Sequence, residues 1–109
     1  MTVKEVLVRA MDRIANHGWC RTELAVDKFG NPVDVEDPMA TAFCSIGSIL
    51  RESKTFELRW EALKQLERVV GRYIGKWNDG PRRTKDEVIQ AFDKAIQLAG
   101  QQGWKAQYE

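Results

Sequence analysis

The sequence has few of the residues and segments that mark several classes of protein. It carries only two cysteines, Cys20 and Cys44, in 109 residues, whereas a secreted scaffold of this size usually carries more. We therefore interpret both as free thiols. No apolar run approaches the roughly 18–20 residues that span a bilayer, and the N-terminal segment lacks the basic and apolar parts of a signal peptide. We expect a cytoplasmic protein without membrane contact.

The sequence also has almost no excess of charge of one sign and few residues that bind zinc. The formal net charge is +1, so no overall bias attracts nucleic acid, and we do not expect nucleic-acid binding. The single histidine and the two cysteines match no zinc spacing, and we predict no metal site and no cofactor. For the acids around one loop, turn and capping roles are expected rather than cation binding; these acids are Asp27, Asp34, Glu36 and Asp37.

The residues that are abundant predict helices. Apolar residues recur at spacings of three and four over residues 3–17, 56–75 and 85–100. Two Thr-x-x-Glu capping boxes, Thr2 with Glu5 and Thr84 with Glu87, mark helix starts. In the helix at 56–75 we expect one broad apolar face against the core, made of Phe56, Trp60, Leu63, Leu66, Val70, Tyr73 and Ile74.

A fourth helix is predicted at 38–51, where Asp37 is a good N-cap and Pro38 suits the first turn. Residues 40–50 carry no charge, which is typical of a helix buried on all sides. Alternating apolar residues at 24–26 and 33–35 flank a turn at 28–32 and predict a short β-hairpin. The expected fold is one domain, 1–109, mainly α with minor β: four helices around the central helix 38–51, with the hairpin before it.

The loop before the last helix is the most informative candidate site. Its cations precede a helix N-terminus, where free amide groups favour an anion, and its tryptophan offers a stacking face. The alternative is structural, because Asn and Asp bond to nearby backbone in turns and a tryptophan can clamp a loop. The candidate ligand- or partner-binding residues are Lys76, Trp77, Asn78, Asp79, Arg82 and Arg83.

Other candidates have simpler interpretations. Cys44 and His17 could form a nucleophile and its base, but Cys44 lies in an apolar run, where core packing is expected. His17 suits a helix C-terminus. Trp19 and Trp104 are either partner anchors or covers for the ends of the core. We assign no catalytic residue and do not expect an enzyme.

The order of several motifs resembles the bacterial and phage family catalogued as domain of unknown function 6197. The resemblance covers nearly the whole chain and rests on Gly18-Trp19, Ala25-Val26-Asp27, Gly30-Asn31-Pro32-Val33, Asp37-Pro38, Phe43-Cys44-Ser45-Ile46-Gly47-Ser48, Trp77-Asn78-Asp79, Arg83-Thr84 and Phe92-Asp93-Lys94-Ala95-Ile96. Such a resemblance implies a bacterial or phage accessory protein and no known activity.

Three functions follow as hypotheses. The first is a small non-enzymatic binding protein of phage or prophage type, acting on a host protein as an accessory or inhibitory factor through the 76–84 loop and the hairpin rim. The second is a domain that sequesters a small anionic ligand or nucleotide in a pocket joining Trp77, Asn78 and Arg83. The third is a small hydrolase that uses Cys44.

Overall fold

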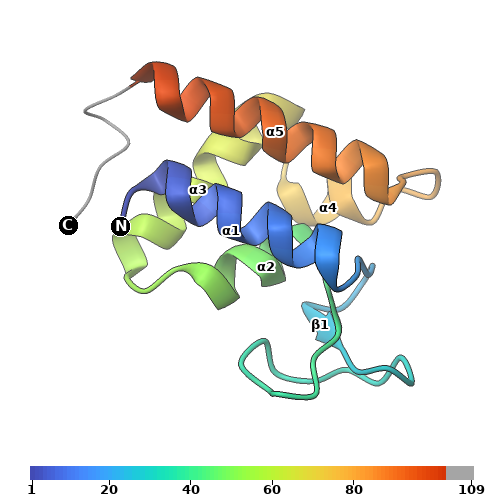
Figure 1. Cartoon of the computed structure of the whole chain (residues 1–109). Coiled ribbons are helices and arrows are strands. Elements are labelled where there is room, and N and C mark those ends of the chain that lie inside the picture. The colour runs from blue at the N-terminus through green and yellow to red at the C-terminus, as the bar shows by residue number, and fades with distance from the viewer. Residues whose placement is uncertain (103–109) are drawn as a thin grey trace.

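The computed structural model describes residues 1–102, and the prediction for Trp104 lies outside them. Helices account for most of the described chain, and a two-stranded antiparallel sheet completes it (Figure 1). The mainly helical class with a minor sheet is confirmed. Within residues 1–102 the elements are α1 (Val3–Asn16), β1 (Ala25–Val26), β2 (Ala42–Phe43), α2 (Ser45–Glu52), α3 (Phe56–Val70), α4 (Ile74–Asn78) and α5 (Lys85–Gln102).

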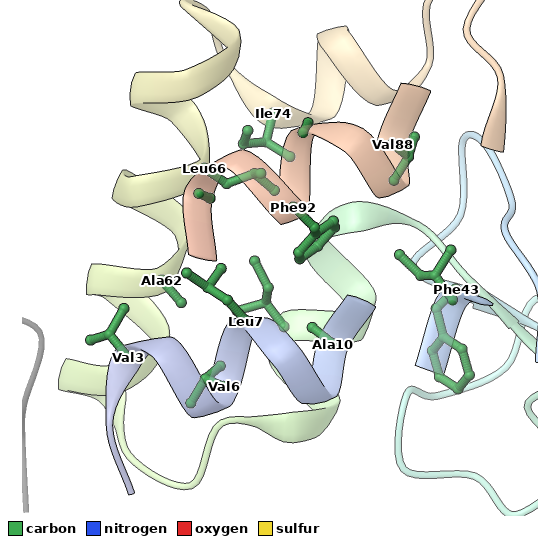
Figure 2. Close-up of a cluster of buried hydrophobic side chains, with 14 of the residues drawn as sticks. Val3, Val6, Leu7, Ala10, Phe43, Ala62, Leu66, Ile74, Val88 and Phe92 are labelled. Carbon is green, nitrogen blue, oxygen red and sulfur yellow. The ribbon is translucent and has the colours of Figure 1, made fainter. Parts of the chain in front are cut away.

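Helix α1 begins at its predicted capping box and packs against α2, α3 and α5. The Glu5 amide donates to Thr2 Oγ1 at 3.1 Å, and the Thr2 amide donates to Glu5 Oε1 at 3.2 Å. The apolar face of α1 enters the core between the other helices (Figure 2); it consists of Val3, Val6, Leu7, Ala10 and Ile14.

The predicted helix at 38–51 begins later than expected, at Ser45. Asp37 instead accepts the Met39 amide at 2.8 Å within its own turn, and residues 42–43 form β2. Strand β2 pairs with β1, in the register Ala25 to Phe43. The strand expected at 33–35 does not form; the chain there contacts β1 through a bridge between Val26 and Pro32 and through the Val33 amide, which donates to the Ala25 carbonyl at 3.1 Å. A Cys44 thiol, in place of Asp37, caps the helix.

Gly47 in α2 lies against the backbone of another segment. A Cβ atom at this position would lie 1.9 Å from the backbone oxygen of Leu24. Helix α2 therefore presses its backbone against the chain that leads into β1, and only glycine leaves room for that approach.

The predicted helix at 56–75 is two helices. Gly71 has a φ of +76° and closes α3 as a left-handed cap, with its amide bonded to the Glu67 carbonyl at 2.8 Å. Glycine adopts this conformation without the steric cost that a side chain brings. The chain then turns and starts the short helix α4, so Tyr73 does not continue the apolar face of α3.

Helix α5 matches its prediction closely. The Glu87 amide donates to Thr84 Oγ1 at 3.2 Å and the Thr84 amide to Glu87 Oε1 at 3.0 Å, which completes the second capping box. Val88 and Phe92 of α5 are fully buried, and α5 packs against α1 and α3 (Figure 2). None of the helices within residues 1–102 has the length and apolar character needed to cross a membrane.

Candidate functional site

Asn78, one of the predicted binding residues, is the centre of a buried polar junction. Helix α4 directs its side chain inward, where it is 1% exposed. Its Oδ1 accepts from Trp19 Nε1 at 2.8 Å, from the Ser45 amide at 3.0 Å and from Ser45 Oγ at 2.7 Å. Its Nδ2 donates to the Cys20 carbonyl at 3.1 Å and to Asp79 Oδ1 at 3.0 Å. One carboxamide thus joins α4, the start of α2 and the segment that follows α1.

Trp77 and Arg83 form a clamp of their own. The guanidinium carbon of Arg83 lies 4.1 Å from the centroid of the Trp77 ring, and Arg83 Nε donates to the Trp77 carbonyl at 2.8 Å. The guanidinium also pairs with Glu87 at 3.3 Å. Asn78 thus points into the core, whereas Arg83 lies on the Trp77 ring, so these two predicted binding residues have separate structural contacts.

The remaining predicted residues lie at the surface. Lys76, Asp79 and Arg82 are exposed. Asp79 Oδ1 also accepts the backbone amide of Thr22 at 2.9 Å, and Thr22 adopts a φ of +67°, unusual for a residue with a β-branched side chain. Asp79 therefore holds a strained turn against α4.

A second arginine–tryptophan pair adjoins the first and was missed by the sequence analysis. Arg21 stacks over Trp19 with its guanidinium carbon 5.1 Å from the ring centroid, and it donates to the Arg83 carbonyl. Trp19 donates in turn to Asn78. Trp19 is therefore tied to the core by its ring nitrogen and covers one end of it, which is one of its two predicted roles.

Cys44 has the structural role that its surroundings predict. The side chain is 6% exposed, and its Sγ accepts the Gly47 amide at 3.2 Å as the N-cap of α2. Burial raises the pKa of the Cys44 thiol. Burial also raises the pKa of Cys20 to about 12, with the neighbouring Cys44 as the next contribution. Thiolates are the reactive form of cysteine, so this environment disfavours nucleophilic chemistry.

The acids of the long loop between the strands hold its turns. Asp27 Oδ1 accepts the amides of Phe29 and Asn31, both at 2.9 Å, and the Asn31 amide is the main cause that lowers the pKa of Asp27. Asp34 accepts the Glu36 amide at 2.9 Å. These are the turn roles that the sequence predicts.

The surface that the sequence analysis missed is a groove on the outer side of α3. It has a volume of about 530 Å³ and an apolar floor, and its lining residues are Ile46, Trp60, Leu63, Lys64, Glu67, Tyr73 and Ile74. Trp60 is 53% exposed and Tyr73 is 61% exposed. Phe56 stacks on Trp60, with ring centroids 6.3 Å apart and an angle of 8° between the rings, and extends the aromatic surface. We call this surface the α3 groove.

The α3 groove corrects the single apolar face predicted for residues 56–75. The face of α3 that enters the core consists of Leu58, Ala62, Gln65 and Leu66. The helical period places Phe56, Trp60 and Leu63 on the opposite side, so α3 carries two apolar stripes. That separation is visible in the sequence, but the prediction merged both stripes into one.

A smaller hollow adjoins the α3 groove. It has a volume of about 170 Å³ and is lined by Thr22, Glu23, Leu24, Cys44, Ile46, Gly75, Asn78 and Asp79. Ile46 lines both hollows. The Tyr73 ring lies over Gly75, because a Cβ there would be 2.7 Å from Tyr73 Cε2. The two hollows are therefore neighbours that share Ile46 as a lining residue.

The fold and these surfaces define a small, mainly helical protein with a buried polar junction and an apolar surface groove. Among known families, the chain belongs to the family of unknown function DUF6197, whose model matches residues 1–98. The match confirms the resemblance seen in the sequence motifs. No curated protein and no solved structure matches the chain.

Proposed function

We propose that this chain is a non-enzymatic binding protein that docks a segment of a partner protein in the α3 groove. One observation supports the proposal most strongly: three large aromatic side chains, Phe56, Trp60 and Tyr73, are more than half exposed around one groove. Contiguous exposed apolar surface on a small protein marks interaction sites, and tryptophan and tyrosine are enriched among the residues that dominate binding energy.

The energy available at this surface is sufficient for recognition. Trp60 leaves 53% of its surface exposed, which for a side chain of about 250 Å² is roughly 130 Å². At about 25 cal/mol per Å², covering that area contributes about 3 kcal/mol. Tyr73 and Leu63 add to this on either side of the groove, so one inserted apolar side chain can serve as an anchor.

The α3 groove is a different binding face from the 76–84 loop that the sequence predicted. A small anion at the start of α5 would compete with Glu87, whose carboxylate already accepts the Thr84 amide and pairs with Arg83. Asn78 and Trp77 have structural contacts of their own. Lys76 and Arg82 are left as exposed cations, which supports an anion site only weakly.

We also propose a biological role for this binding. The family resemblance favours an accessory protein of bacterial or phage type, with a host protein as its partner and inhibition of that partner as the proposed outcome. We place this action in the cytoplasm. Binding of this kind requires no covalent step. It also fits the two thiols, since burial raises the pKa of Cys20 and of Cys44 and favours their protonated forms.

Site-specific photo-crosslinking in the native cell tests the proposal. The photoreactive amino acid p-benzoylphenylalanine replaces Trp60 or Tyr73, and Phe29 serves as the matched control because it is an aromatic residue exposed on the loop between the strands. We expect a discrete cross-linked protein from the two groove positions and none from Phe29. The absence of a cross-link at both groove positions, or the same product from Phe29, contradicts the proposal.

A further inference from the structure

The charges around the α3 groove are unequal at its two ends. Lys64 is the cation of the rim, and it lies 3.6 Å from the Glu61 carboxylate one turn earlier. Glu67 lines the groove as a carboxylate, and its Oε2 accepts the Ile74 amide at 3.4 Å. At the other end, the adjoining hollow is lined by the exposed carboxylates of Glu23 and Asp79. The α3 groove is therefore apolar, and the hollow beside it forms an acidic end of this surface.

Apolar surface lies beside those acids. Ile46 lines both hollows, and Leu24, which is 45% exposed, borders Glu23. Ile46 therefore links the aromatic side chains of the α3 groove to the carboxylates of Glu23 and Asp79 in the adjoining hollow. A complementary segment therefore carries an apolar side chain at one end and a cation at the other.

We propose that the occupant of the α3 groove is a partner-protein segment in which a large apolar side chain is followed by an arginine or lysine. The apolar side chain enters the groove beside Trp60 and Tyr73, and the cation lies against Glu23 and Asp79. This inference rests on the proposed function and names the chemistry of the partner that the same site takes.

A second copy of the chain fits this charge distribution poorly. In a twofold dimer the same patch faces itself, so the carboxylates of Glu23 and Asp79 would approach a surface that carries the same two acids. Like charges placed together disfavour association. A basic segment from another protein would instead place opposite charges next to Glu23 and Asp79, which favours association.

Peptide selection followed by calorimetry tests the inference on the full chain. A random dodecapeptide library displayed on phage is sorted against the protein at low salt, and a selected peptide is then titrated. Four variants are compared with the wild type: Trp60→Ala in the groove, Glu23→Gln at the acidic end, and the controls Phe29→Ala and Asp93→Asn. Asp93 is exposed on α5, so its variant removes the same charge elsewhere.

The expected consensus is an aromatic or leucine residue followed by arginine or lysine. Trp60→Ala weakens binding by about 30-fold, as for a central anchor. Glu23→Gln weakens it by about two- to fivefold at low salt, and this difference disappears at high salt because the pair is exposed. The two controls bind like the wild type.

The outcomes separate this inference from the proposed function. A consensus without basic residues, or a Glu23→Gln effect no larger than that of Asp93→Asn, overturns the inference while a Trp60→Ala loss keeps the groove as the binding site. Unchanged binding in Trp60→Ala overturns both. If removal of residues 103–109 tightens peptide binding tenfold, the occupant of the groove is the chain's own C-terminal end. If the wild type forms a dimer that Trp60→Ala abolishes, the occupant is a second copy of the chain. Either result overturns the inference.

Discussion

Removal of the Asn78 side chain is expected to be among the most damaging single changes in the polar interior. In Asn78→Ala the donors Trp19 Nε1, the Ser45 amide and Ser45 Oγ all lose their acceptor, and the Cys20 carbonyl loses its donor. At about 1 kcal/mol for each lost bond, the free energy of unfolding falls by roughly 3–4 kcal/mol. A small domain has only about 5–15 kcal/mol of stability, so the loss is a large fraction of the total.

The isosteric variant Asn78→Asp separates hydrogen bonding from shape. It keeps the Oδ1 acceptor, but it places an oxygen where Nδ2 donates to the Cys20 carbonyl and to Asp79. The Cys20 carbonyl then faces an oxygen and loses its donor. We expect the variant to lose about 1–3 kcal/mol, the cost of a buried polar group left without a partner, although the bonds to Oδ1 are kept.

Urea denaturation followed by tryptophan fluorescence and circular dichroism measures both effects. The control is Asn16→Ala, which truncates an exposed asparagine at the end of α1 and is expected to change stability by less than about 0.5 kcal/mol. If a variant changes only the stability, the urea concentration at the unfolding midpoint shifts, and the slope of the unfolding free energy against urea concentration stays the same. A loss below about 1 kcal/mol in Asn78→Ala, or an Asn78→Asp variant as stable as the wild type, refutes the junction that we describe.

Two further predictions concern packing and the thiols. Gly47→Ala is expected to destabilise the fold by about 1–3 kcal/mol, because its Cβ would meet the Leu24 oxygen. Among residues 1–102, the flexible end of Lys4 is what lies near Gly100, so Gly100→Ala on α5 should instead stabilise the fold by up to about 1 kcal/mol. Equal changes of melting temperature in Gly47→Ala and Gly100→Ala would contradict the close approach of α2 to the Leu24 backbone. With its pKa at about 12 rather than 9.0, Cys20 should react with a disulfide reagent at pH 8 on the order of a thousandfold more slowly in the native state than in urea, in proportion to its thiolate fraction; comparable rates would show an ordinary thiol.

The starts of α1 and α5 were the most predictable part of the fold. Both capping boxes form as expected, since the hydroxyl of Thr2 or Thr84 and the carboxylate of a glutamate three residues later need no distant partner. The burial of Val88 and Phe92 on α5 likewise follows from helical spacing alone. These features depend on local sequence, so a single sequence is sufficient to find them.

The features that depend on distant segments were not predictable in this way. The pairing of β2 with β1 joins strands on either side of a long loop. The start of α2 at Ser45 has a distant partner as well, because Asn78 Oδ1 accepts the Ser45 amide across the fold. Asn78 itself was found in the sequence as a candidate binding residue, but its role is structural because the partners that bury it come from three separate segments. The α3 groove was missed because spacing shows that a stripe is apolar and does not show whether a neighbour covers it.

The most direct test of the account is the affinity of the cross-linked partner, once isolated, for Trp60→Ala and for Phe29→Ala. Both variants remove an exposed aromatic side chain, and they differ in whether that side chain lines the α3 groove. We predict that the dissociation constant rises by about 30-fold for Trp60→Ala and stays at the wild-type value for Phe29→Ala. Equal dissociation constants for the two variants would contradict the assignment of the α3 groove as the binding site.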